Sequence, residues 1–236
     1  MYLYRFIERK LLFLWEKMVK TVIFDMDGVI VDTEPVHRYA YHSHFAELGI
    51  EISEHVYNSF TGHSTKNTYE RIKELYGVEG DVQEMVLRKR ALFNDAFDTK
   101  PDLELIDGVR DLIEGLYQKG VELVVGSSAS KSTIDRVFKR FNLYPYFTHI
   151  VSGEDLPKSK PDPAIFLKAA SLAKHNAKDE CIVIEDSTNG IKAANAAGIR
   201  VIGYKSANSK QQDYTGANYI VRDFTAIDAD YILNLE

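Results

Sequence analysis

The chain has 236 residues, enough for one large domain or for one domain that carries a smaller insert. Hydrophobic residues make up 45% of the chain and charged residues 27%, which is typical of a globular protein and not of a disordered or collagen-like one. The net charge of −6 argues against a nucleic-acid-binding surface, which needs a concentrated basic face. The single cysteine, Cys181, excludes an internal disulfide bond, and its apolar neighbours predict a buried, unreactive thiol.

Residues 1–17 are basic and apolar, and a second methionine, Met18, follows them. They lack the apolar core and cleavage site of a signal peptide, and the run 11–15 is too short to cross a bilayer. Two interpretations stay open for this N-terminal extension: an amphipathic helix that lies on the domain or on a partner, or a segment upstream of a protein that begins functionally at Met18. We expect a cytoplasmic protein without a membrane partner, because there is no export signal and only one cysteine.

From Lys20 onward, short apolar runs alternate with helical patterns, which is typical of a parallel sheet covered by helices. The predicted strands are Thr21–Phe24, Glu122–Gly126, Thr148–Ser152, Cys181–Glu185, Arg200–Tyr204 and Tyr219–Val221. The helices predicted between them are Val109–Lys119, Ser132–Phe141, Pro163–Lys174 and Asn189–Ala197. Continuous apolar runs are expected of parallel strands that are buried on both faces. We therefore predict an α/β fold with a parallel sheet.

The interval between the first two strands contains no convincing strand. It holds three helical stretches, Val36–Leu48, Thr65–Tyr76 and Val82–Phe97. Such an interval is too long for an ordinary crossover between strands. We interpret residues 34–104 as an inserted helical cap, and residues 18–33 and 105–236 as the core, with Pro101 and Asp102 marking the return to it. A cap at this place would cover a site at the strand ends.

Charged and hydroxyl side chains follow four of the predicted strands. In chain order they are Asp25 and Asp27 with Gly28, then Ser127 and Ser128 with Ala129, then Lys160, and finally Glu185 and Asp186. The carboxyl ends of parallel strands meet at one edge of a sheet, so these groups are expected to lie together. Each motif alone is ordinary at a turn or a helix cap. Their joint placement indicates a site for a metal and a phosphate.

The chemistry of phosphoryl transfer explains these residue types. Mg²⁺ prefers oxygen ligands and commonly keeps several waters, so Asp25 and Asp186 suffice with a backbone carbonyl and the substrate phosphate. The metal and Lys160 would offset the repulsion between an anionic nucleophile and an anionic phosphoryl group. Asp27 could protonate the leaving oxygen and then take a proton from water, a role worth on the order of 10²–10⁴ in rate. Gly28 would allow a sharp turn beside the phosphate.

Two other interpretations of local patterns are disfavoured. The run from Gly126 to Ser132 is similar to a nucleotide-binding P-loop, but it lacks the glycine before the lysine and is one residue too short. His37, His42 and His44 could suggest zinc, but they lie on one predicted cap helix without a further cluster nearby.

The four motifs together resemble the haloacid dehalogenase superfamily, in the branch that includes β-phosphoglucomutase and small sugar-phosphate phosphatases. The resemblance runs from about Val19 to Val221. The segment 25–29 matches the first motif of the family, Ser128 the second, Lys160 the third and the pair 185–186 the fourth. It implies a Rossmann-like core with a helical cap inserted after the first strand. It also implies that Asp25 forms an aspartyl-phosphate and that Asp27 is the general acid and base.

The resemblance assigns further roles by position. It implies catalytic roles for Asp25, Asp27, Ser128 and Lys160, with Ser127 as the alternative to Ser128. It implies phosphate binding by Gly28, Ser128, Ala129 and Lys160, and metal binding by Asp25, Asp27, Glu185 and Asp186. Candidate substrate-binding residues of the cap are His37, Gly62, His63, Ser64 and Lys66, with Lys89 also considered. We expect a small phosphate ester as substrate, and a monomer or weak dimer.

The acceptor of the phosphoryl group separates the remaining interpretations. Asp27 favours phosphoryl transfer over dehalogenation and over phosphonate cleavage, because both of those branches lack this aspartate. The resemblance to the mutase holds at Asp32, Thr33 and His37, but Thr65 stands where the mutase has an arginine for its second phosphate. Residues 34–35 are also more similar to the phosphatase subgroup. We therefore predict a phosphatase, with a phosphosugar mutase as the alternative and a non-catalytic binding protein on the same fold as the least favoured interpretation.

Overall fold

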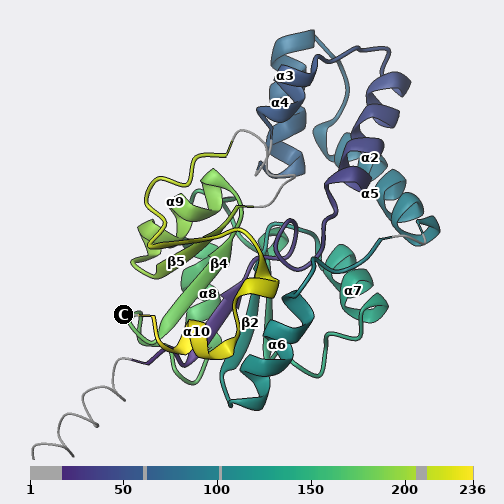
Figure 1. Cartoon of the computed structure of the whole chain (residues 1–236). Helices are drawn as coiled ribbons and strands as arrows, with labels where there is room; N and C mark the ends of the chain where they lie inside the picture. Colours follow the sequence, from purple (N-terminus) through teal and green to yellow (C-terminus); the bar gives the residue numbers. More distant parts are fainter. Residues whose placement is uncertain (1–17, 61–62, 101–102, 206–211, 236) are drawn as a thin grey trace, which may run out of the picture.

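The computed structural model describes residues 18–60, 63–100, 103–205 and 212–235. The described residues form one six-stranded sheet in the order β3-β2-β1-β4-β5-β6, and all five pairings are parallel (Figure 1). The strands are β1 (Thr21–Phe24), β2 (Glu122–Ser127), β3 (His149–Ser152), β4 (Cys181–Glu185), β5 (Arg200–Tyr204) and β6 (Tyr219–Val221). The predicted α/β fold with a parallel sheet is confirmed.

The order of the strands reverses between β1 and β4. From β1 the chain adds β2 and β3 on one side, and then returns to add β4, β5 and β6 on the other. Phe24 pairs with Ile184, so the residues that follow β1 and β4 emerge side by side, and the Asp25 amide donates a hydrogen bond to the Ile184 carbonyl at 2.9 Å. In open parallel sheets, a ligand crevice forms at such a switch point.

Helices cover both faces of the sheet, which explains why its strands are continuously apolar. The core helices are α6 (Val109–Gln118), α7 (Lys131–Arg140), α8 (Ala164–Leu172), α9 (Thr188–Ala197) and α10 (Ala229–Leu233), with short 3₁₀ helices at Gly153–Asp155 and Phe224–Ala226. Helices α8 and α9 pack on the face that carries Ile23, and α6 and α7 pack on the face that carries Val22 and Phe24. Cys181 is fully buried, and burial raises the pKa of its thiol to about 11.

Four described helices lie between β1 and α6, beyond the carboxyl ends of the strands (Figure 1). They are α2 (Glu34–Glu47), α3 (Glu54–Asn58), α4 (Thr65–Tyr76) and α5 (Val82–Thr99), and together they are called the helical insert here. The insert has a hydrophobic cluster of its own, which includes the aromatic side chains of Tyr41, Phe45 and Tyr69. Its two connections to the core lie side by side, because Val31 forms an antiparallel bridge with Leu105.

Most helices of the insert follow the sequence pattern, and one does not. Helix α4 has the predicted bounds; it begins after Ser64, whose hydroxyl accepts a hydrogen bond from the Asn67 amide at 3.2 Å, and it ends at Gly77 in the left-handed conformation. Helix α3 was not predicted, because five residues are too few to display a helical period. Within the described ranges, no helix combines the length and the apolarity that a membrane-spanning segment requires.

Candidate active site

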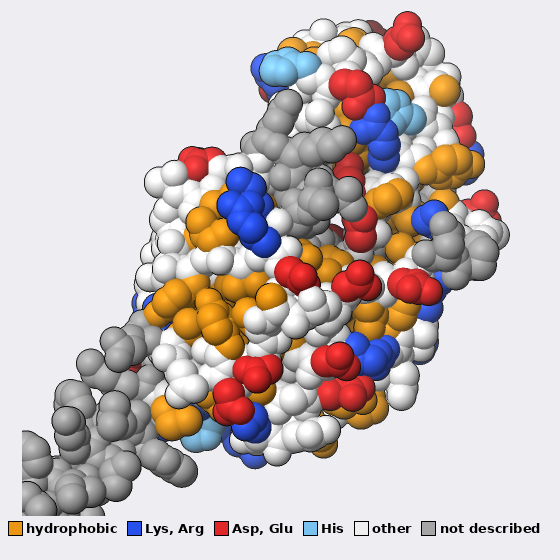
Figure 2. All heavy atoms as spheres, viewed as in Figure 1, with side chains coloured by type: hydrophobic (Ala, Val, Ile, Leu, Met, Phe, Trp, Pro, Cys, Tyr) orange, Lys and Arg blue, Asp and Glu red, His pale blue; other side chains and the backbone are white. Residues whose placement is uncertain are grey.

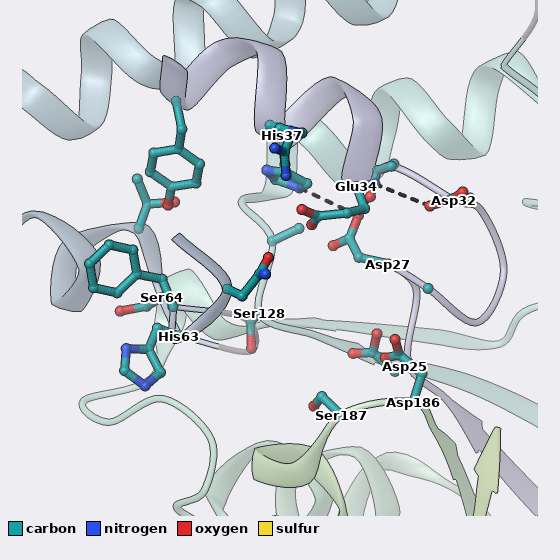
Figure 3. Close-up of a pocket in the computed structure, with 18 of the residues that line it drawn as sticks. Asp25, Asp27, Asp32, Glu34, His37, His63, Ser64, Ser128, Asp186 and Ser187 are labelled. Carbon is teal, nitrogen blue, oxygen red and sulfur yellow. Dashed lines mark hydrogen bonds and ion pairs between the residues drawn. The ribbon is translucent and has the colours of Figure 1, made fainter. Parts of the chain in front are cut away.

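A cavity of about 430 Å³ lies where the carboxyl ends of the strands meet the helical insert (Figure 3). Every residue that the sequence predicted for the core side of the site lines this cavity. They are Asp25, Asp27, Gly28, Ser128, Ala129, Lys160, Glu185 and Asp186. The fold therefore brings together groups that are separated by up to 161 positions in the sequence, from Asp25 to Asp186.

Lys160 joins two carboxylates at the centre of the core wall. Its Nζ donates a short hydrogen bond to Asp25 Oδ1 and a second one, of 2.8 Å, to Glu185 Oε1, and all three side chains are less than a tenth exposed. Burial disfavours the ammonium, but the attraction of Asp25 and Glu185 outweighs it and raises the pKa of Lys160. Burial also raises the pKa of Asp25, to about 7, although Lys160 opposes this shift. Lys160 therefore keeps its charge at the point where a phosphoryl group would meet Asp25.

Glu185 is held from the other side by the start of α9. Its Oε2 accepts hydrogen bonds from the backbone amide of Ser187 at 2.6 Å and from the Ser187 hydroxyl at 3.0 Å. A Cβ atom at Gly190, in the first turn of α9, would overlap the Glu185 carboxylate. The helix therefore leaves room for this carboxylate only because residue 190 is a glycine, and the orientation of Glu185 in turn fixes Lys160.

Asp186 and Asp25 offer two carboxylates to the same space (Figure 3). Gly28 has a φ of +86°, and a Cβ atom there would overlap the Asp186 carboxylate, so this group lies directly against the loop that follows β1. Among the residues that the structure describes, no set of three or more His, Cys, Asp or Glu side chains is arranged around a metal position. Two carboxylates still fit Mg²⁺, which binds proteins through one or two carboxylates and completes its shell with waters and substrate phosphate.

Asp27 faces the helical insert instead of the other core carboxylates. Its Oδ1 accepts a 2.5 Å hydrogen bond from the Thr33 hydroxyl and lies 3.8 Å from His37 Nε2. Burial acts against the carboxylate, but His37 and Thr33 together hold the pKa of Asp27 below its ordinary value. Thr33 is the residue that precedes α2, yet its hydroxyl caps no helix amide because it is bonded to Asp27.

A buried lysine of α5 completes this contact between insert and core. Lys89 is 3% exposed, and its Nζ lies 2.6 Å from His37 Nδ1. Burial lowers the pKa of Lys89 to about 7, and burial together with Lys89 lowers the pKa of His37. Asp27 is thus linked through His37 to a cation on another helix of the insert.

The two serines after β2 have different surroundings. Ser127 is fully buried, and its hydroxyl accepts a hydrogen bond from the Ala129 amide at 3.1 Å, whereas Ser128 and Ala129 line the cavity. Ser130 begins α7 by accepting a hydrogen bond from the Thr133 amide. Of the two candidate serines, Ser128 is therefore the one that can meet a ligand in the cavity.

The insert side of the cavity brings together only some of the predicted residues. His37, His63, Ser64 and Thr65 line it, while Gly62 lies outside the described residues. The hydroxyl of Ser64 caps α4. The side chain of Lys66 is 66% exposed and lies 3.7 Å from Glu70; it borders a neighbouring hollow and not the cavity itself.

The comparisons with known proteins agree with this geometry. A family model described as haloacid dehalogenase-like hydrolase matches residues 22–204. The chain belongs to this family. It is 30% identical over 210 residues to the β-phosphoglucomutase of Bacillus subtilis, covering 86% of this chain and 89% of the mutase. It is 29% identical over 189 residues to the phosphorylated carbohydrates phosphatase of Thermotoga maritima, covering 78% and 84%.

Solved structures extend the likeness to the fold. The crystal structure of CbbY from Rhodobacter sphaeroides in complex with phosphate aligns with a TM-score of 0.82 over 92% of this chain and 100% of that one, at 23% identity. The sequence-based prediction of the haloacid dehalogenase superfamily and of its Rossmann-like core is therefore confirmed.

Sequence reasoning missed several residues of this haloacid dehalogenase-like site, among them one hydrogen-bonded pair. Glu34 and Tyr57 both line the cavity, and the Tyr57 hydroxyl donates a 3.0 Å hydrogen bond to Glu34 Oε1. Glu34 was considered only as a mark of the phosphatase subgroup. Tyr57 lies in the unpredicted helix α3, so no signal in the sequence connected it with the site.

Proposed function

We propose that the chain is a magnesium-dependent phosphatase that hydrolyses a small phosphorylated metabolite through a covalent phosphate on Asp25. The observation that carries the proposal is the buried contact of Lys160 with Asp25 and Glu185, beside Asp186, at the switch point of the sheet. The likeness to a phosphatase of phosphorylated carbohydrates supports a monoester substrate, and a sugar phosphate is the class that we favour.

In the first step, a carboxylate oxygen of Asp25 attacks phosphorus and the bond to the leaving oxygen breaks. Lys160 donates to Asp25 in the structure, so its charge lies where the negative charge of the phosphoryl group would arrive. Backbone amides near Gly28 and Ala129, with the Ser128 hydroxyl, are suited to bind the phosphate oxygens, because all three residues line the cavity. Glu185 positions Lys160.

Asp27 moves the protons of both steps. It protonates the leaving oxygen as the first bond breaks, and it then takes the proton of the water that attacks phosphorus on Asp25, which releases inorganic phosphate. Its contacts with Thr33 and His37 orient it towards the insert, where the leaving group would lie. Because Asp27 belongs to the core and its partner His37 to the insert, the arrangement of the two parts controls the proton transfer.

Asp25 and Asp186 would hold Mg²⁺ through their carboxylates, together with a backbone carbonyl of the loop after β1. When bound, Mg²⁺ supplies positive charge that offsets the repulsion between Asp25 and the phosphoryl group. Asp27 and Glu185, which the resemblance also counted as metal-binding, direct their side chains to Thr33 and Lys160 respectively. We therefore assign them proton transfer and the positioning of Lys160.

In this proposal, residues 34–104, which include the helical insert, form a cap over the site. Its two adjacent connections at Val31 and Leu105 suit a hinge, and the cavity between insert and core would exclude bulk water when it is filled. A cytoplasmic location and a monomeric or weakly dimeric state remain predictions.

The first test is hydrolysis of p-nitrophenyl phosphate by the purified chain. We expect turnover with Mg²⁺, loss of turnover on chelation, and recovery when Mg²⁺ is restored. Asp25→Asn is expected to abolish turnover, because an amide cannot accept the phosphoryl group. Asp111→Asn, on the exposed side of α6, is the control and should retain activity. A purified, folded protein with no Mg²⁺-dependent turnover would refute the proposal.

A phosphosugar mutase is the second candidate, because the likeness to β-phosphoglucomutase covers most of both chains. The contrary observation is Thr65 at the start of α4, where the resemblance places the mutase arginine. The assay is β-glucose 1-phosphate with a catalytic amount of glucose 1,6-bisphosphate. Free phosphate should appear faster than glucose 6-phosphate, and the opposite order would establish the mutase.

A further inference from the structure

The insert wall of the cavity carries a carboxylate that the proposed reaction does not use. Glu34 is the first residue of α2; its Oε1 accepts a 3.0 Å hydrogen bond from Tyr57, and its side chain lies close to Asp27, at the space that Asp27 faces (Figure 3). The leaving group of a phosphate on Asp25 would occupy this space, because Asp27 must reach the leaving oxygen. Glu34 therefore faces the part of the substrate that is released.

The described cations that line the cavity are already paired. Among the described residues that line the cavity, seven are Asp or Glu and two are Lys or Arg. Lys160 is committed to Asp25 and Glu185. Arg38 forms a short ion pair with Glu54 and lies 5.2 Å from the centre of the Tyr57 ring. On the face shown in Figure 2, acidic side chains also gather where the insert meets the core.

The basic groups outside the cavity do not offset the excess of acidic over basic residues in its lining. A neighbouring hollow shares Ser128 and Lys160 with the cavity and is bordered by Lys66, Lys89, Arg90 and Lys158. Lys89 is 3% exposed and its Nζ already contacts His37 Nδ1 at 2.6 Å. Arg90 is paired with Glu154 at 2.9 Å, and Lys66 is largely exposed beside Glu70. Among the described residues, an anionic group on the far end of a substrate would have to compete with Glu54 for Arg38 or reach this hollow to find a cation.

We infer that the cavity selects phosphate monoesters whose leaving group is an uncharged, hydroxyl-rich compound, and that Glu34 sets this preference. Hydroxyl groups can donate hydrogen bonds to the Glu34 carboxylate, whereas a second phosphate or a carboxylate would be desolvated beside it, where the described cations Arg38 and Lys89 already contact Glu54 and His37. Tyr57 is the positioning residue, because its hydroxyl fixes one oxygen of Glu34. This inference rests on the proposed phosphatase activity and names its substrate class.

Two acyclic six-carbon phosphates make a matched pair of probes. Sorbitol 6-phosphate and 6-phosphogluconate carry the same phosphate and differ at carbon 1, which is a hydroxymethyl group in one and a carboxylate in the other. The measurement is the inhibition constant of each against hydrolysis of p-nitrophenyl phosphate, which reports binding even if neither is turned over. We expect the wild-type chain to bind sorbitol 6-phosphate at least about tenfold more tightly.

Variants of the chain test whether Glu34 causes the preference for sorbitol 6-phosphate. Glu34→Gln keeps the shape and the contact with Tyr57 but removes the charge, so the ratio of the two inhibition constants should fall by about tenfold, towards one. Tyr57→Phe should lower the ratio less. Glu47→Gln is the control: it removes the same charge from the same helix, where Glu47 pairs with Arg88 outside the cavity, and it should leave the ratio unchanged.

The outcomes separate this inference from the proposed function. Absence of Mg²⁺-dependent turnover of p-nitrophenyl phosphate refutes the phosphatase itself. An active phosphatase that binds 6-phosphogluconate as tightly as sorbitol 6-phosphate, or binds neither, overturns the inference alone. An unchanged ratio in a folded Glu34→Gln variant overturns the role of Glu34. If that variant does not fold, the wild-type ratio still tests the substrate preference, and Tyr57→Phe still tests the role of Glu34.

Discussion

The two walls of the cavity are built differently. On the core wall, Lys160, Asp25 and Glu185 are each less than a tenth exposed, and the Lys160 ammonium directly contacts both carboxylates. On the insert wall, Glu34 and Arg38 are only partly buried, and both are held by residues of α3. Close-packed interiors restrict side chains to one arrangement, whereas partly exposed groups can change partners. The core wall is therefore suited to fixed chemistry, and the insert wall to the choice of substrate.

The largest expected effect comes from removing the Lys160 charge from the core wall. Lys160→Met should lower kcat/KM by about 10³, because Asp25 and Glu185 would then repel the incoming phosphate without a compensating charge. It should also cost about 3–5 kcal/mol in the free energy of unfolding, since two buried carboxylates lose their partner. Lys158→Met changes an exposed lysine two residues away and is the control. Steady-state kinetics and urea unfolding measure the two effects, and a Lys160→Met variant within threefold of wild type in kcat/KM would contradict the account.

A smaller effect should come from filling the space behind Glu185. Gly190→Ala places a methyl group on the Glu185 carboxylate and should lower both stability and kcat, through displacement of Lys160. Gly115→Ala is the matched control in α6, because its added methyl group would meet Ala229 at an ordinary 3.5 Å. That substitution should be neutral or raise the melting temperature, since alanine favours helix over glycine by about 1 kcal/mol. Equal melting temperatures and equal kcat for the two variants would show that the carboxylate has room to move.

The core wall could be predicted from the sequence, because its residues follow strands. A short buried parallel strand, such as β1 or β4, fixes where the side chains at its carboxyl end emerge, and Asp25 and Glu185 directly follow the paired residues Phe24 and Ile184. The pairing of Lys160 with Glu185 was not predicted, because nothing in the local sequence shows which carboxylate a lysine from another loop will contact. The need for a glycine at position 190 likewise became apparent only in three dimensions.

The insert wall was less predictable for a physical reason. Contacts such as that of Tyr57 with Glu34 depend on how short helices pack, and α3 is too short to show a helical period in the sequence. Lys66 was predicted to bind substrate on its charge alone, but the direction in which α4 begins turns its side chain towards Glu70 and solvent. Residue type therefore indicated which core residues line the cavity, but it did not indicate which residues of the insert do so.

The smallest expected effect concerns the contact between the two walls. Arg90 of α5 pairs with Glu154 of the core at 2.9 Å, and both side chains are partly exposed. Arg90→Gln should change KM by no more than a few fold, because such pairs are worth about 0.2–1 kcal/mol, and the difference from wild type should shrink as salt is added. Arg71→Gln breaks a pair with Glu74 within α4 and should leave KM unchanged. A large effect of Arg90→Gln that persists at high salt would mean that this arginine contacts the substrate.

The covalent phosphate on Asp25 can be observed directly in the Asp27→Asn variant. p-Nitrophenolate leaves without protonation, so this variant should still transfer a phosphoryl group to Asp25, but it lacks the base that activates water for the second step. After rapid acid quench of Asp27→Asn with p-nitrophenyl phosphate, mass spectrometry should find one added phosphoryl group on the peptide that contains Asp25. Asp25→Asn should show none. A phosphoryl group on another residue, or release of p-nitrophenol with no phosphorylated protein at any time, would contradict the central role of Asp25.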